Sequence, residues 1–79
     1  MVVEGTIVGV METLPLQLSI DTGRGTRQVA LAEGTTITSG GQLADMAQLL
    51  PGRRVRVEGE AANESAMRAA RIDIDTPEG

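Results

Sequence analysis

The feature that most constrains this chain is a two-residue alternation of aliphatic and polar side chains along five short segments. In the first segment, residues 1–10, Val3, Gly5 and Ile7 fall on one side of an extended chain, with polar residues between them. Successive side chains of a β-strand point to opposite faces, so this spacing indicates a strand with one buried face. The same spacing recurs in four further segments: residues 16–21, 26–32, 53–60 and 67–75. We therefore predict five strands.

Two of these strands contain a break in the alternation. Val10 keeps an inward position only if Val8 and Gly9 absorb one extra residue, and a second break falls near residues 70–71. A β-bulge inserts such an extra residue into one strand and bends it, and bulges are common at the rims of barrels. The sequence therefore predicts that the first and last strands bend around a small barrel.

The interval between the third and fourth strands has a different pattern. Residues 33–41 are rich in glycine, serine and threonine around one aliphatic residue, which indicates a loop. Four apolar residues then share the spacing i, i+3, i+4 and i+7, namely Leu43, Met46, Ala47 and Leu50. This spacing is typical of a short amphipathic helix, and the proline and glycine at residues 51–52 would end it.

The predicted order of elements is three strands, one short helix and two strands. This order, with two bulges, favours an all-β fold with one short helix: a five-stranded OB-like Greek-key barrel with the helix between strands 3 and 4. SH3-like barrels lack the helical interval and rank second. We expect residues 1–75 to form a single domain and residues 76–79 to be a frayed tail.

Three stretches of the sequence resemble a known family: VEGTIVGV at residues 3–10, VALAEGTTITSGGQLADMAQLLPGRRVRVEGE at residues 29–60 and AARIDI at residues 69–74. Together they resemble a bacterial family of small OB-like domains known only as a domain of unknown function. The turn before the fourth strand departs from the family pattern, because Arg53 stands where the family often has Asp. The resemblance implies an OB-like barrel in a bacterial protein, commonly an exported one, and supplies no catalytic or ligand-binding residue.

The chain lacks cysteine, histidine and all three aromatic residues. Disulfides and ordinary zinc or haem sites are therefore excluded, and we expect no cofactor. The core must consist of Val, Ile, Leu, Met and Ala, with Met46 and Met67 inside and Met11 exposed. No apolar run approaches the roughly 20 residues that span a bilayer, so we expect a soluble domain without membrane insertion. This expectation fits a cytoplasmic protein or an exported one whose signal peptide is absent from this chain.

Catalytic chemistry has little support in the sequence. Histidine, cysteine, lysine and tyrosine, which are common general acids and bases, are all absent. The serines have no partner base, and the pair Asp73 and Asp75 is more typical of a solvated strand face than of a cation site. The sequence GRGT at residues 23–26 indicates a hairpin turn and not a phosphate-binding loop. We expect a protein that is not an enzyme, with no catalytic, cofactor-binding or metal-binding residue.

Three arginines within residues 53–56 raise the question of a nucleic-acid site. Arg54, Arg56, Glu58 and Glu60 would share the outer face of the fourth strand, where their charges cancel. The net charge of −4 and the absence of aromatic side chains also disfavour phosphate binding and base stacking. Single-stranded nucleic-acid binding, in the manner of initiation-factor-like barrels, is therefore the alternative to our main prediction.

The main prediction is a binding or architectural module that contacts an unidentified protein partner. By analogy with OB folds, the binding face would be the outer side of the second and third strands with their turn. The candidate binding residues are Gln17, Ser19, Arg24, Arg27 and Gln28. Open strand edges would also allow homo-oligomers to form by strand addition.

Overall fold

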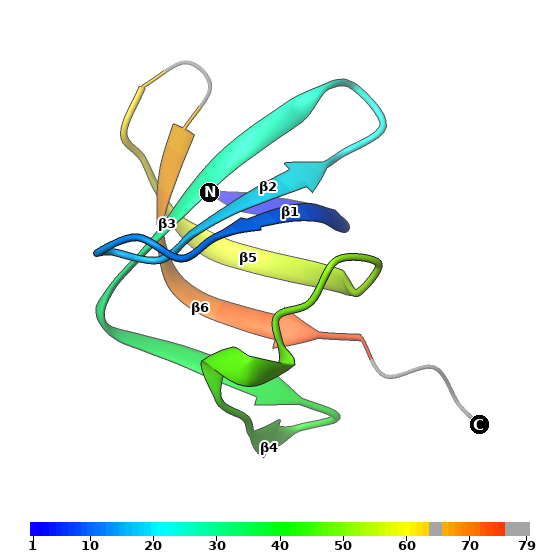
Figure 1. The fold of residues 1–79 in the computed structure, drawn as a ribbon, viewed down its shortest axis with the longest axis vertical. Helices are drawn as coiled ribbons and strands as arrows, with labels where there is room; N and C mark the ends of the chain where they lie inside the picture. The colour runs from blue at the N-terminus through cyan, green and yellow to red at the C-terminus, as the bar shows by residue number, and fades with distance from the viewer. Residues whose placement is uncertain (64–65, 76–79) are drawn as a thin grey trace.

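The described residues of the chain fold into a six-stranded sheet with almost no helix (Figure 1). This computed structural model describes residues 1–63 and 66–75, so the predicted tail at residues 76–79 lies outside the described residues. The elements are β1 (Val2–Met11), β2 (Gln17–Asp21), β3 (Thr26–Ser39), β4 (Gln42–Leu43), the 3₁₀-helix η1 (Met46–Gln48), β5 (Arg54–Ala61) and β6 (Ala66–Ile74). The predicted all-β class is confirmed. Within the described part of the chain, no helix has the length and apolar character needed to span a membrane.

The five longer strands pair in a closed circle. β1 pairs antiparallel with β2 and β5, β2 with β3, and β5 with β6. A parallel pairing of β3 with β6 completes the circle. β4 is an additional edge strand beside β3, so the sheet has six strands where the sequence predicted five (Figure 1).

Both predicted bulges are confirmed. The register of β1 against β2 shifts between Ile7 and Gly9, which leaves Val8 as the extra residue. The register of β6 against β5 skips Ala70 in the same way. Each extra residue increases the local bend of its strand, and the bends allow five short strands to close into a circle.

The third strand is longer than predicted, and the loop expected at residues 33–41 is wrong for most of its length. β3 continues to Ser39 and pairs with β6 on both sides of a bend (Figure 1). At this bend the Thr35 hydroxyl accepts a hydrogen bond from the Ala32 N–H at 2.9 Å and lies 2.9 Å from the Ala69 carbonyl oxygen. Threonine is β-branched and favours strands. A prediction based only on aliphatic residues does not take this preference into account.

The predicted amphipathic helix is absent, and this prediction is wrong. Gly40 and Gly41 instead form a turn with φ angles of 60° and 83°, and the chain returns as β4. After β4, the Asp45 side chain caps η1 by accepting a hydrogen bond from the Ala47 N–H at 3.0 Å. Fewer than about 12 residues separate the glycine turn from Pro51, and isolated helices that short are marginal in water. The chain therefore forms a hairpin and a single 3₁₀ turn.

The apolar stripe assigned to that helix is exposed to solvent. Leu43 is 83% exposed, Met46 57% and Leu50 50%. Leu49, which is not part of the stripe, is 1% exposed and packs in the core. The prediction that Met46 is a core residue is therefore wrong, because helical spacing does not apply to a chain that makes only one 3₁₀ turn.

Aliphatic side chains fill the inside of the closed sheet. The buried core consists of Val3, Ile7, Leu18, Ile20, Val29, Leu31, Ile37, Leu49, Val55, Val57, Met67, Ala69, Ile72 and Ile74. Met67 is among them and Met11 is exposed, as predicted. All five longer strands contribute to this core, which requires the inward alternation that the sequence shows.

Candidate functional site

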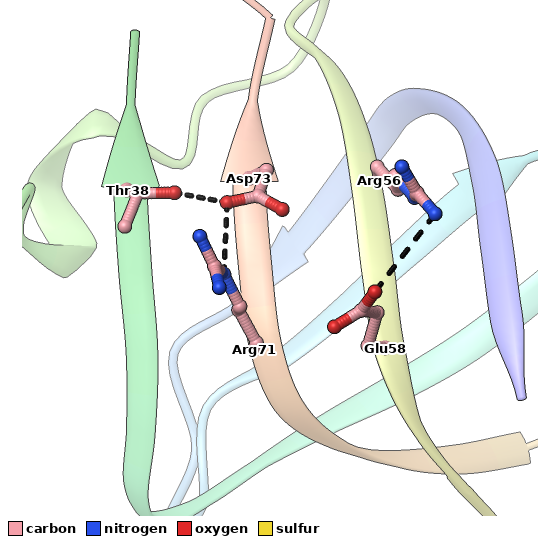
Figure 2. A network of polar contacts seen from close by, with 5 residues as sticks. All are labelled: Thr38, Arg56, Glu58, Arg71 and Asp73. Carbon is pink, nitrogen blue, oxygen red and sulfur yellow. Dashed lines mark hydrogen bonds and ion pairs between the residues drawn. The ribbon is translucent and has the colours of Figure 1, made fainter. Parts of the chain in front are cut away.

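The outer face of β5 and its neighbouring strands carries a row of mixed charges (Figure 2). The strand register places Arg56 between Glu4 of β1 and Asp73 of β6, and it places Glu58 opposite Arg71. Along β5 itself, Arg56 Nη2 lies 3.9 Å from Glu58 Oε1. Opposite charges that face each other on a solvated sheet stabilise it by less than about 1 kcal/mol per pair. The register thus agrees with a structural role for this row.

Asp73 is held by two neighbouring side chains. The Thr38 hydroxyl on β3 donates a hydrogen bond to Asp73 Oδ1, and the Arg71 Nε–H donates to the same oxygen at 3.1 Å (Figure 2). The Thr38 hydrogen bond, followed by the hydrogen bond and charge of Arg71, lowers the pKa of Asp73 although partial desolvation opposes the shift. A carboxylate kept ionised in this way is a poor proton donor near neutral pH. The three side chains form a polar link between β3 and β6.

Within the described residues, the carboxylates of Asp73 and Asp75 do not form part of a larger acidic cluster. Among the residues that the structure describes, no three acidic side chains are positioned to hold a metal ion. Asp73 is engaged by Thr38 and Arg71, and the Asp75 N–H donates to the Arg54 carbonyl oxygen at 2.8 Å. Both residues thus take part in the pairing of β6 with its neighbours.

The structure brings three of the five predicted binding residues onto one surface. Gln17 and Ser19 of β2 share the outer face with Gln28 of β3, and the Gln28 side-chain amide donates to Ser19 Oγ at 3.0 Å. Arg24 is exposed in the β2–β3 turn, whereas Arg27 pairs with a buried residue of β2 and follows the inward alternation of β3. This face stays a predicted binding surface. Its serine and glutamine hydrogen-bond each other, and its geometry does not indicate a ligand.

A second surface, not predicted from the sequence, is a groove between two connecting segments. It has a volume of about 1310 Å³ and lies between the β1–β2 loop, residues 12–16, and the η1 segment, residues 44–51. The buried side chains of Leu31, Ile37 and Leu49 contribute to its lining. We call this surface, bounded by residues 12–16 and 44–51, the apolar groove.

Large aliphatic side chains line both walls of the apolar groove. Leu14 in the β1–β2 loop has the exposure of an unfolded residue, 102%, and Met46 and Leu50 on the other wall are each at least half exposed. Single exposed aliphatic residues are normal on protein surfaces. A contiguous group around a concave surface is typical of an interaction site.

Both walls of the apolar groove are held by hydrogen bonds within the chain. In the β1–β2 loop, the Thr13 hydroxyl donates to the Pro15 carbonyl oxygen at 2.8 Å. On the other wall, Asp45 caps η1, and the Gly52 N–H donates to the Ile7 carbonyl oxygen at 2.7 Å, which ties this segment to β1. Contacts within the chain therefore fix the shape of the groove, as is usual for binding sites.

No family model, curated protein or solved structure matches the chain. The geometry of the apolar groove therefore provides the main argument about function, because a fold alone does not determine what a protein binds.

The aliphatic pattern of the sequence does not reveal the groove, for two reasons. Leu14 lies in the connection between the first two predicted strands, and Met46 and Leu50 have the spacing of the apolar stripe of an amphipathic helix. One signal is available: Leu14 precedes Pro15 in the turn between these strands, where polar residues and glycine usually dominate. Such a turn indicates either burial or contact with a partner.

Proposed function

We propose that the protein is a non-enzymatic binding module whose apolar groove holds an aliphatic segment of a protein partner. The observation that carries this proposal is the exposure of Leu14, Met46 and Leu50 around a preformed groove. Burying an aliphatic side chain is worth about 1.5–3 kcal/mol, so a few such residues can dominate the binding energy of an interface.

We also propose that the closed sheet is an OB-like Greek-key barrel of five strands with β4 as an addition. The pairing of β1 with both β2 and β5 and the parallel pairing of β3 with β6 support this architecture. The resemblance to a bacterial family of small OB-like domains points the same way. The barrel would then serve as a rigid support for the two segments that form the apolar groove.

A protein segment fits the apolar groove better than a small molecule does. Sites for small ligands usually enclose about 300–1,000 Å³ and bury most of the ligand. The groove is larger, at about 1310 Å³, and Leu14 on its wall is fully exposed to solvent. A peptide in an extended or helical conformation can place several aliphatic side chains along such a surface.

Nucleic-acid binding, the alternative considered from the sequence, has less support. The described lining of the apolar groove contains none of the seven arginines, and the chain has no aromatic residue on which a base could stack. On β5 and β6 the arginines face carboxylates, as in the pairs of Arg56 with Asp73 and Arg71 with Glu58. Phosphate binding needs positive charge that is not neutralised in this way.

Selection of short random peptides on the immobilised protein tests the proposed function. We expect the selected peptides to be rich in leucine, isoleucine, valine or methionine. Leu14→Ser and Leu50→Ser should each weaken their binding by about tenfold or more, because a loss of 1.4 kcal/mol is tenfold in Kd. Isothermal titration calorimetry measures the dissociation constants.

Leu43→Ser is the matched control. It makes the same chemical change at a residue that is 83% exposed and does not line the apolar groove. We expect it to leave the affinity within about twofold of the wild type. Peptides that bind all three variants as well as the wild type, or a selection that yields no binding peptide, would contradict the proposal. Tight, salt-sensitive binding of a single-stranded oligonucleotide would favour the alternative function.

A further inference from the structure

The apolar groove carries negative charge on both walls. Glu12 belongs to the wall formed by the β1–β2 loop, and Asp45 belongs to the wall that contains η1. Both residues are exposed, and neither takes part in an ion pair among the described residues. Asp45 uses Oδ1 to cap η1, which leaves its second oxygen available to a ligand.

The positive charges of the chain lie elsewhere. Two of the seven arginines are in the β2–β3 hairpin, and the other five are in or next to β5 and β6. In the part of the chain that the structure describes, none of them lines the groove. The two carboxylates therefore set the sign of the electrostatic potential at this surface, and the net charge of −4 adds to it.

Charge discriminates among the occupants that an apolar groove can accept. A second copy of the chain docked symmetrically on this surface would bring another Glu12 and Asp45 towards the first pair, and like charges across an interface oppose binding. Nucleic acids and anionic lipid surfaces would bring phosphates to the same carboxylates. A peptide with both aliphatic and basic side chains matches the groove in shape and in charge.

We infer that the apolar groove binds a cationic aliphatic segment of a protein partner, with Glu12 and Asp45 contacting lysine or arginine side chains of that segment. This inference rests on the proposed function and adds the charge of the partner. Exposed ion pairs are weak, so each carboxylate changes the Kd by about two- to fivefold, and salt reduces the effect. Aliphatic contacts thus supply most of the affinity, and the carboxylates select the partner.

Three synthetic peptides of equal length test the inference. They carry leucine at the same positions and differ only in having lysine, glutamine or glutamate at the remaining ones. Calorimetry with the full chain at about 20 mM and about 200 mM NaCl gives the Kd values, and shifts of leucine and methionine methyl resonances in NMR spectra locate the site. We expect the lysine peptide to bind tightest and the glutamate peptide weakest, with a smaller difference at the higher salt.

Substitutions of the two carboxylates sharpen this test. Glu12→Gln and Asp45→Asn should each reduce the preference for the lysine peptide over the glutamine peptide by about two- to fivefold. Asparagine is also a good helix N-cap, so Asp45→Asn preserves η1. Glu4→Gln is the matched control, because it makes the same change in net charge at an exposed residue of β1 outside the groove. We expect it to keep the preference.

The possible failures are distinguishable. Equal affinities for the lysine and glutamine peptides, both lost in Leu14→Ser, would overturn the inferred charge and leave the proposed function standing. If none of the peptides binds, or if Leu14→Ser weakens none of them, the proposed function fails together with the inference. A dimer that dissociates on Leu14→Ser but not on Leu43→Ser, seen by sedimentation, would assign the groove to a second copy and overturn the inference.

Discussion

Two strand glycines lie where the closed sheet leaves no room for a side chain. A Cβ atom on Gly59 would lie 2.0 Å from the Arg68 carbonyl oxygen, and one on Gly5 would lie 2.2 Å from the Asp21 carbonyl oxygen. Both oxygens belong to the backbone and cannot rotate away. A Cβ atom on Gly9 would meet its nearest neighbour in β2 at 3.7 Å, which is an ordinary contact. The three glycine-to-alanine variants therefore test how closely the strands pack.

The expected loss of stability follows from these distances. To restore a contact of about 3.4 Å, the backbone at Gly59 must move by about 1.4 Å, more than a quarter of the roughly 4.8 Å between paired strands. Overpacking costs about 1–3 kcal/mol, and occasionally more. We therefore expect Gly59→Ala and Gly5→Ala each to lower the free energy of unfolding by about 3 kcal/mol. A domain of this size has about 4–12 kcal/mol in total, so the loss is a large fraction of it.

Urea unfolding followed by far-UV circular dichroism measures the effect, because the chain has no tryptophan or tyrosine for fluorescence. With an m value of about 1 kcal/mol/M, a loss of 3 kcal/mol lowers the unfolding midpoint by about 3 M. Gly9→Ala should leave the midpoint unchanged or raise it slightly, since alanine restricts the unfolded chain. Midpoints for Gly5→Ala and Gly59→Ala within about 0.5 M of the wild type would refute the packing argument. A Gly9→Ala midpoint as low as theirs would refute it as well.

Three further variants probe the core and the polar link between β3 and β6. Leu49→Ala should cost about 2–5 kcal/mol in urea unfolding, because Leu49 is only 1% exposed, and a loss below 1 kcal/mol would contradict its place in the core. Thr38→Val should cost about 1 kcal/mol by removing the hydrogen bond to Asp73. Because the pKa of Asp73 is lowered in the folded chain, its contribution to stability is present above about pH 4 and is lost as the pH falls through the folded pKa. The urea midpoint of the wild type should fall between neutral pH and pH 3, and in Asp73→Asn it should fall by less. An equal fall in both proteins would argue against the link between the pKa of Asp73 and stability.

The strands were predictable wherever aliphatic residues alternate. Val3 and Ile7 in β1 and Val55 and Val57 in β5 all point inward as the sequence indicates. The bulges were predictable for the same reason, because an inward position that arrives one residue late requires an extra residue before it. The second half of β3 was not predictable in this way. Its threonines can pair in a strand without adding to an aliphatic pattern.

The predicted helix was wrong because the spacing of apolar residues does not by itself show whether they are buried in a core or exposed on the surface. Leu43, Met46 and Leu50 have helical spacing, but only nine residues, 42–50, separate the glycine turn from Pro51, and a helix of that length is marginal on its own. The apolar groove is not apparent from the sequence for the same reason, because the helical spacing of Met46 and Leu50 predicts burial and these side chains are exposed. The sequence does indicate that one predicted binding residue, Arg27, is not on the outer face. Arg27 lies two residues before the buried Val29, so both side chains point to the inward side of β3.

The exposed apolar residues of the segment that was predicted to be helical, Met46 and Leu50, also favour a binding partner. A chain this short buries only about 60% of the surface of its unfolded state, so aliphatic side chains left outside the core are a loss to its stability. Leu49 is the only member of the η1 segment in the buried core, while Met46 and Leu50 face the groove with Leu14. Their apolar surface is removed from water only when something covers it. The β2–β3 face lacks this driving force, because its residues are polar and two of them, Ser19 and Gln28, already hydrogen-bond each other. The physical reason to expect binding is therefore strongest at the apolar groove, next to carboxylates that favour a basic ligand.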